Sequence, residues 1–338
     1  MSADAARTSR ARQGWLGRLK PDWYLVLILT MVAIATLAPA RGAAAPAFGL
    51  ATSIAIGLVF FLHGARLSRE AVIGGLTHWR LHFVVLGSTF GLFPILCLGL
   101  AALPAWITPS ALAGGVVFLG CLPSTIQSSI AFTVIARGNV AAAVAAASAS
   151  NLLGVALTPL LVALTLHAKG AASPHAVQAI VLQLLAPFLA GQLLRRWIGG
   201  FVTRNAGWLS KIDRGSILLV VYTAFSSAVV GGVWRMVGAL DLTRLLVICA
   251  GLLAVVLLAT WSAARALGFA KPDEITIVFC GSKKSLASGV PMAGVLFPGP
   301  AAGVALLPLM VFHQIQLMAC AVIASRYANR RDSEAESR

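Results

Sequence analysis

The chain has 338 residues, of which 59% are hydrophobic and only 11% are charged, and its mean hydropathy is +0.90. These values exclude an ordinary soluble globular domain and indicate an all-α, polytopic membrane protein. The formal charge of +16 would favour a nucleic-acid partner in a soluble protein, but here the basic residues follow the membrane spans, so we expect the lipid bilayer as a partner and no nucleic acid.

Ten apolar segments are long enough to cross a hydrocarbon core of about 30 Å, which needs roughly 17 to 25 residues per helix. In chain order the predicted spans are 23–39, 47–65, 81–103, 110–136, 139–166, 174–194, 214–232, 242–264, 273–297 and 301–325. The first span is expected to stay as a helix, because its apolar core is long and further spans follow directly. A basic segment, 1–22, precedes the ten-helix domain, 23–325, and a tail, 326–338, follows it.

Basic residues are divided unequally between the two sides of the predicted membrane. Alternate loops place 20 of the 26 Lys and Arg residues on one side and four on the other. Cytoplasmic loops carry the excess of Lys and Arg, so both termini are expected in the cytoplasm. The Ala- and Arg-rich composition suggests a bacterium, and therefore its inner (plasma) membrane.

The longest polar, basic connector, about 195–214, divides the spans into two sets of five. Because five is odd, the second set enters the membrane from the opposite side, which predicts two inverted repeats, about 23–166 and 174–325. Spans four and nine are both interrupted at mid-depth, the fourth by Pro123 and a run of polar residues and the ninth around Gly281. Broken backbone at this depth is tolerated where it is buried or lines a cavity, so the pair predicts a binding site of the kind found in transporters. The alternative is two local kinks satisfied by Ser and Thr side chains.

The acidic residues leave the middle of the membrane without a carboxylate. None of the ten lies at the middle of a span, and Asp213, Asp241, Asp273 and Glu274 are interpreted as caps and dipole partners where helices begin. The five cysteines have no metal-ligand spacing and are interpreted as small buried residues. We therefore expect no metal site and no cofactor, with sodium as the one ion to consider. No GxxxxGK[ST], HExxH or GxSxG motif occurs, which argues against an enzyme.

Two adjacent lysines, Lys283 and Lys284, are the only Lys or Arg residues near the middle of a span. A lysine at the bilayer centre costs about 2.5 to 3.5 kcal/mol on insertion scales. The ammonium groups could snorkel, lose their protons on burial, or donate to the carbonyls left open where the first half of span nine ends. They could instead bind an anionic substrate, with one lysine facing the crossing and the other a wet cavity, because neighbouring side chains on a helix point about 100° apart.

The N-termini of the second halves of the broken helices add a positive field that favours anions. The candidate substrate-binding residues are Ser124, Thr125, Gln127, Ser282, Lys283, Lys284, Ser285, His313 and Gln314. Further polar residues in the same spans are Ser150 and Gln316.

Four segments resemble the bile acid:sodium symporter superfamily (SBF-like), most closely the branch of solute carrier family 10 member 7 and its bacterial relatives. They are Cys121-Leu122-Pro123 with the following polar run, Ala136-Arg137-Gly138-Asn139, Thr158-Pro159, and Phe279-Cys280-Gly281-Ser282-Lys283-Lys284-Ser285. The resemblance extends from Trp23 to about Arg326. It implies ten helices in a panel domain and a core domain, crossed helices four and nine, and alternating access for an organic anion coupled to sodium.

The resemblance also implies an ion site, with one departure. Ser128 and Ser129 match a Ser-Asn pair that contributes a sodium site in bile acid transporters, Ser148 falls near that site's ligands, and we add Asn151 as a fourth ion-binding candidate. Span nine of those transporters carries a glutamate and a glutamine that bind sodium, whereas this sequence has Phe279 or Cys280 and then Lys283 or Lys284. We therefore hypothesise that one of the two lysines replaces a bound sodium ion.

The sequence thus predicts a symporter-like secondary transporter of a small organic anion, with sodium sites altered by lysines. The alternative is a membrane regulator of ion (calcium) homeostasis that does not transport, which the resemblance to the member 7 branch suggests. Whether the chain forms a weak homo-oligomer is left open.

Overall fold

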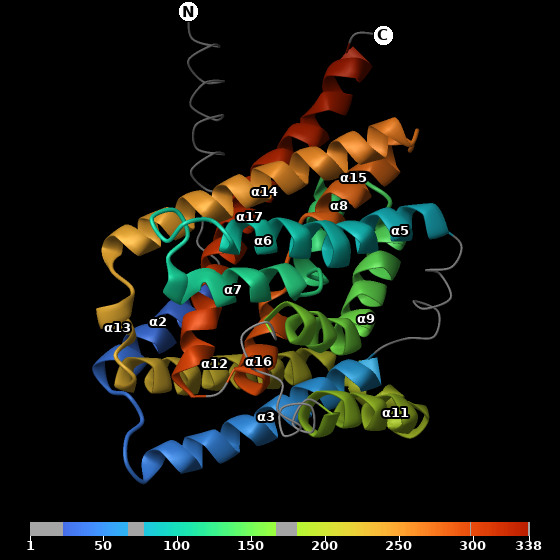
Figure 1. Cartoon of the computed structure of the whole chain (residues 1–338). Coiled ribbons are helices and arrows are strands. Elements are labelled where there is room, and N and C mark those ends of the chain that lie inside the picture. Colours follow the sequence, from blue (N-terminus) through green and yellow to red (C-terminus); the bar gives the residue numbers. More distant parts are fainter. Residues whose placement is uncertain (1–22, 67–77, 167–180, 298, 337–338) are drawn as a thin grey trace, which may run out of the picture.

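The computed structural model describes residues 23–66, 78–166, 181–297 and 299–336, and all regular structure in these ranges is helical (Figure 1). The α-helices are α2 (Trp23–Leu37), α3 (Ala44–Arg66), α5 (Trp79–Gly87), α6 (Phe93–Ala101), α7 (Ser110–Cys121), α8 (Gln127–Ile135), α9 (Val140–Leu166), α11 (Ala186–Arg204), α12 (Ala206–Val230), α13 (Val233–Met236), α14 (Ala239–Ala266), α15 (Lys271–Gly281), α16 (Leu286–Leu296) and α17 (Pro300–Glu336). Two π-helical turns, η1 (Ser88–Leu92) and η3 (Val181–Leu185), directly precede α6 and α11.

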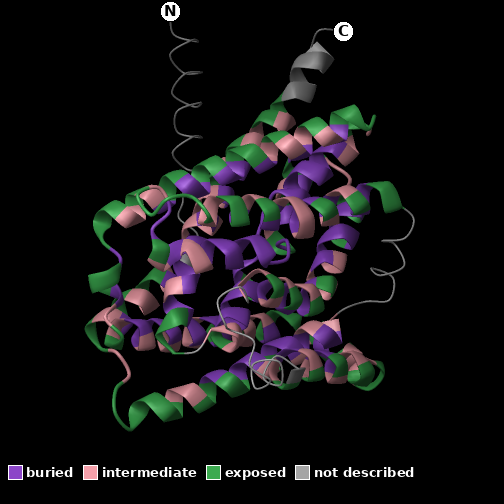
Figure 2. Cartoon of the chain, in the orientation of Figure 1, coloured by how far each residue is buried: buried purple, intermediate pink, exposed green. Residues whose placement is uncertain are grey.

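Six helices within the described ranges are long and apolar enough to cross a membrane. They are Ala44–Arg66, Trp79–Ala101, Val140–Leu166, Ala206–Val230, Ala239–Ala266 and Pro300–Asn329. Many large apolar side chains lie on the outside of the bundle, among them Leu37 (86% exposed), Phe83 (73%) and Leu193 (73%), while the buried residues lie at its middle (Figure 2). An outer surface of this kind is stable in lipid, so the chain is a multi-pass membrane protein.

Predicted spans four and nine are the two that the structure divides. Span four becomes α7 and α8, and span nine becomes α15 and α16, each with a short non-helical segment between its halves. Part of predicted span six, 174–180, lies outside the described residues, as do the segment 1–22 and the last two residues of the tail. The remainder of the tail continues α17 as far as Glu336.

The predicted connector at 195–214 is wrong as a polar break between helices. α11 continues to Arg204, α12 begins at Ala206, and only Asn205 separates them. Arginine and lysine are good helix formers, so a basic segment leaving the bilayer can remain helical. Asp213 consequently lies inside α12 and not at a helix start. Its carboxylate pairs with Arg66 (2.7 Å) and His63 (3.7 Å). The capping interpretation is confirmed for Asp241, whose carboxylate accepts from the Gly238 N–H at 3.1 Å.

The helices pack in two groups. α2, α3, α11 and α12 pack on one another, with α3 and α11 side by side at the bottom of Figure 1. The remaining helices surround the two broken pairs, and α12 links the groups through α16 and α17. α3 and α11 touch backbone to backbone, because a Cβ added at Gly64 would overlap the Phe188 carbonyl and one added at Gly191 would overlap the Phe61 carbonyl.

Candidate functional site

The interruptions of the two broken helices lie side by side and are hydrogen-bonded to each other. The Ser285 N–H donates to the Pro123 carbonyl (2.9 Å), and the Ser124 hydroxyl donates to the Cys280 carbonyl (2.6 Å). Residues 122–125 and 282–285 are buried, whereas Ile126 is exposed. The two breaks that the sequence predicts are therefore one structural unit, which we call the crossing: residues 122–126 and 282–285 with the helix ends beside them.

The carbonyl groups at the end of α15 are satisfied by hydroxyl groups. A helix leaves its last four carbonyls without intrahelical partners, which is costly away from water. Here each of the four accepts from one serine: Ser282 donates to Val278 (2.6 Å), Ser129 to Phe279 (3.1 Å), Ser124 to Cys280 (2.6 Å) and Ser88 to Gly281 (2.8 Å). The lysines are thus not needed at this end, contrary to one of the alternatives drawn from the sequence.

Lys284 instead fills a cage of backbone oxygens made by other helices. Its ammonium nitrogen donates to the carbonyls of Thr89, Gly120 and Leu122, each at 2.7 Å, and lies 4.2 Å from the centre of the Phe93 ring. The side chain is fully buried. Gly120 is at the C-terminal, negative end of α7, where a cation is favoured.

Local backbone geometry explains why two of these carbonyls are open. The Thr89 carbonyl could accept from the N–H of residue 93 or of residue 94. The Phe93 N–H donates to the Ser88 carbonyl instead, in the π-helical pattern of η1, and Pro94 has no N–H, so the Thr89 carbonyl has no backbone donor. The Gly120 carbonyl would pair with the Ser124 N–H in a continuous helix, but that N–H donates to the Ser150 hydroxyl at 3.0 Å.

Lys283 lies in a different, more aromatic environment. Its ammonium nitrogen donates to the Ser128 carbonyl (2.9 Å) and lies 4.0 Å from the centre of the Phe132 ring and 5.3 Å from that of Phe279. It is also fully buried, and no acidic side chain within the described residues forms an ion pair with either lysine. The expectation that one lysine faces a wet cavity is therefore wrong for this conformation, because both charges are enclosed by carbonyls and rings.

Most of the other candidate residues gather at the crossing. Thr125 bonds the hydroxyls of Ser128 (2.7 Å) and Ser129 (3.0 Å). The Asn151 amide donates to the Ser124 carbonyl (2.7 Å) and accepts from Ser288 (2.8 Å). The candidates from spans four, five and nine thus form one connected polar network.

Three candidates lie outside this network. Gln127 begins α8 and is exposed, Ser148 is half-buried, and neither side chain makes a hydrogen bond within the described residues. Gln314 is partly buried, and its Oε1 has no partner there. They are on the expected helices, but none of the three side chains hydrogen-bonds to the network within the described residues.

Of the two glutamines expected from span ten, Gln316 and not Gln314 bonds the crossing. Its Oε1 accepts from the Lys284 N–H and its Nε2 donates to the Lys284 carbonyl, both at 2.9 Å, so it replaces the backbone partners that the broken helix lacks. His313 lies beside it, with Nδ1 2.8 Å from the Gln316 Nε2. Sequence reasoning missed Ser88 and Thr89. The signal that could have found Thr89 is Pro94, whose missing N–H leaves a carbonyl open in the preceding turn.

An apolar, membrane-crossing helical bundle built around two interrupted helices, whose breaks bond to each other, has the organisation of a secondary transporter. The chain belongs to the SBF-like CPA transporter family, whose model matches residues 22–329. It is 58% identical to an uncharacterized Pseudomonas aeruginosa protein over 94% of this chain and 96% of that one. It is 54% identical to the Escherichia coli protein named "Putative symporter YfeH" (92% and 94%) and 28% identical to the Xenopus tropicalis "Sodium/bile acid cotransporter 7" (92% of each chain).

The family establishes the general activity. A member of a transporter family moves a small-molecule solute while in contact with membrane lipid, so the chain is a membrane transporter and not an enzyme. The resemblance to the bile acid:sodium symporter superfamily and its member 7 branch is confirmed.

Proposed function

We propose that the protein is a secondary transporter of a small organic anion, working by alternating access in the bacterial inner membrane with both termini in the cytoplasm. Its ten spans form two inverted repeats, about 23–166 and 174–325. The observation that carries the proposal is the crossing: two broken helices meet around two buried ammonium groups that have no carboxylate partner among the described residues.

The packing of the helices supports a division into two moving parts. α2, α3, α11 and α12 correspond to predicted spans one, two, six and seven, and they pack as one group. In the proposed repeats these are the first two spans of each half, as expected for a panel related by pseudo-symmetry. The other spans, with the crossing at their centre, form the core that moves against it.

The electrostatics of the crossing favour an anion as the substrate. Two unpaired positive charges lie there, and α8 begins at the crossing without a side-chain cap, so its first N–H groups add a positive end. Ile126 and Gln127 are exposed at that end, whereas the lysines are enclosed. We therefore place the substrate at the start of α8, near Thr125, Gln127 and Ser128, with Lys283 as the nearest fixed charge because it bonds the Ser128 carbonyl.

Transport can be tested with purified protein in liposomes. We expect saturable uptake of at least one member of a panel of small radiolabelled carboxylates, sulfonates and sulfate esters, and a loss of tenfold or more in Lys283→Met. Lys211→Met, which removes an exposed charge on α12, is the control. Folded wild-type protein that takes up no member of the panel would favour the regulator of ion homeostasis instead.

The second part of the proposal is that Lys284 occupies the position of a coupling sodium ion. Its ammonium takes three carbonyl oxygens at 2.7 Å, and backbone carbonyls are the ligands that broken helices offer to sodium in transporters. The Lys284 ammonium thus supplies the positive charge that a sodium ion would bring to the crossing. Under this proposal Ser128, Ser129, Ser148 and Asn151 are not required to bind an ion at that position.

Sodium-dependent stability tests this replacement. Wild-type melting temperature is expected to be the same in sodium and in choline at equal ionic strength, whereas Lys284→Gln and Lys284→Glu open the cage and should be stabilised by sodium. A ligand at one hundred times its Kd adds about 2.7 kcal/mol, a shift of several degrees. Lys283→Gln and Lys283→Glu are the matched comparison. Sodium should stabilise them less, because losing the Lys283 ammonium frees only the Ser128 carbonyl. Indifference to sodium in both Lys284 variants would count against the replacement.

A further inference from the structure

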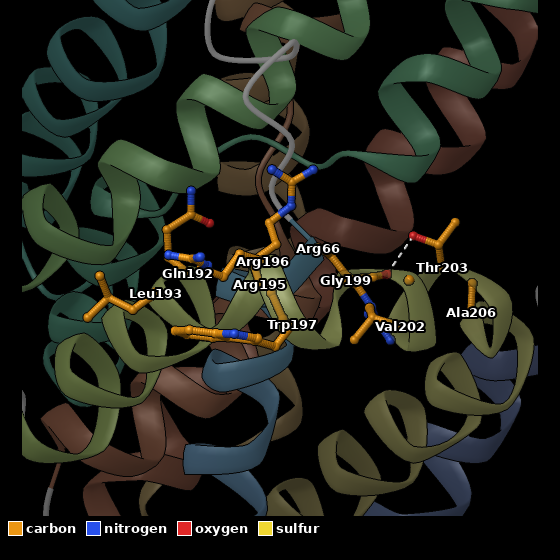
Figure 3. A pocket seen from close by; sticks show the side chains of 12 residues that line it. Arg66, Gln192, Leu193, Arg195, Arg196, Trp197, Gly199, Val202, Thr203 and Ala206 are labelled. Atoms are coloured by element: carbon orange, nitrogen blue, oxygen red, sulfur yellow. Dashed lines mark hydrogen bonds between the residues drawn. The ribbon is translucent and has the colours of Figure 1, made fainter.

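A basic hollow lies away from the crossing, at the junction of α3 and α11 (Figure 3). It has a volume of about 1100 Å³, and its polar and aromatic lining consists of Arg66, Gln192, Arg195, Arg196, Trp197 and Thr203. None of the described residues that line it is acidic. The transport mechanism proposed above makes no use of these side chains.

The side chains of this hollow offer unused hydrogen-bonding capacity. Arg66 is tied to Asp213 through Nη1 (2.7 Å), but its Nη2 is buried and has no partner within the described residues. The Oε1 of Gln192 is likewise buried without a partner there. Buried polar atoms without partners are uncommon, so the pair marks a place where an additional polar group fits.

The charges of the described residues that line the hollow are positive in sum. Asp213 offsets the charge of Arg66, and no carboxylate in the described ranges pairs with Arg195 or Arg196. The Arg196 guanidinium lies 4.7 Å from the centre of the Trp197 ring, and this stacking orients it. A guanidinium presents a planar fork that matches a phosphate group with two parallel hydrogen bonds.

The hollow lies at the membrane boundary, next to lipid. Arg66 is the last residue of α3, a helix long enough to span the bilayer, so the hollow is at one end of that span. Along α11, Leu193, Trp197 and Phe201 recur every four residues with exposed fractions of 73%, 66% and 52%. Such a stripe faces acyl chains, and an exposed tryptophan beside arginines is typical of the headgroup level.

We propose that this hollow binds a phosphate group, with Arg195 and Arg196 as its principal donors and the free Nη2 of Arg66 as a third. The phosphate comes from an anionic phospholipid whose acyl chains lie along the apolar stripe of α11, or from a soluble phosphate. Gln192 binds a hydroxyl of the headgroup through its open Oε1. Occupation of the hollow ties the α3–α11 pair to one depth in the membrane.

The test uses full-length protein in nanodiscs, with retained lipid counted by native mass spectrometry. In mixtures of phosphatidylglycerol and phosphatidylcholine, wild type should retain phosphatidylglycerol preferentially, and Arg195→Gln/Arg196→Gln should reduce that retention at least fivefold. The control is Arg204→Gln/Lys211→Gln, which removes the same charge from exposed residues of α11 and α12 that do not line the hollow. A second variant, Gly200→Leu, keeps every charge and adds bulk where a new Cβ meets no atom within 4 Å; it should weaken retention as well.

Inorganic phosphate, titrated against chloride in phosphatidylcholine nanodiscs, separates the two sources. Thermal stabilisation by phosphate that is lost in Arg195→Gln/Arg196→Gln would assign the hollow to a soluble ligand, and no stabilisation together with selective lipid retention would assign it to the headgroup. Equal loss of lipid in both double variants, or no preference for either ligand in wild type, would overturn the proposal. Because the readout is binding, it is independent of the uptake assay.

Discussion

Replacing Lys284 by methionine is expected to lower the free energy of unfolding by about 3 to 5 kcal/mol, because three buried carbonyl groups lose their hydrogen-bond donor. Methionine has nearly the same length but donates nothing, so the carbonyls of Thr89, Gly120 and Leu122 would remain buried without a partner. Each such group costs about 1 to 3 kcal/mol. Thermal unfolding of the purified protein in detergent, followed by intrinsic fluorescence, should show the melting temperature fall by about 4 to 7 degrees.

Lys283→Met provides an internal comparison. Lys283 serves only one carbonyl and two aromatic rings, so its removal should cost less than half as much. Lys211→Met changes an exposed residue of α12 and should leave the melting temperature within a degree or two of wild type. A loss in Lys284→Met no larger than that in Lys283→Met would show that the carbonyl cage does not hold the crossing together.

A single methyl group added at Gly64 is expected to separate α3 from α11. The new Cβ would overlap the Phe188 carbonyl, which is backbone and cannot rotate away, so the two helix axes would have to move apart. Overpacking usually costs about 1 to 3 kcal/mol, and Gly64→Ala should reach or exceed the top of that range because the obstacle is rigid. Melting temperature and expression level in membranes are the measurements.

Gly49→Ala is the matched control on the same helix. A Cβ at Gly49 meets no atom within 4 Å, so the substitution gains helix propensity without a clash and should be neutral or stabilising by up to about 1 kcal/mol. Similar destabilisation by both substitutions would indicate that α3 tolerates no change of this kind and that the contact with Phe188 is not special.

Most of what the sequence predicted of the fold came from the lengths of the apolar segments and the positions of their interruptions. The predicted breaks in spans four and nine are confirmed, because Pro123 and the polar run after it, and the Gly-Ser-Lys-Lys segment, have no apolar alternative at that depth. The basic segment at 195–214 was misjudged as a break. Polarity there reflects the end of the membrane and not the end of a helix, and composition alone does not separate the two.

The sequence predicted which residues gather at the site better than it predicted which of them hydrogen-bond to each other. Hydroxyl and amide residues of spans four, five and nine do meet, but which serine serves which carbonyl depends on helix rotation, which a sequence read span by span does not fix. Thr89 illustrates the limit. Its importance comes from a π turn and a proline five residues later, a backbone effect without any chemically conspicuous side chain. Gln316 and Gln314 differ in the same way, since two residues along a helix point about 200° apart.

The carbonyl cage around Lys284 also bears on energetics. A free cation that binds on one side of a membrane and departs on the other delivers about 2.3 kcal/mol per 100 mV of potential to each turnover. An ammonium attached to the backbone returns to its starting point at the end of every cycle, so the membrane potential does no net work on it. For a solute to be accumulated against its own concentration difference, the driving force has to enter through some other charge, and with Lys284 alone at this position the carrier would only equilibrate its solute.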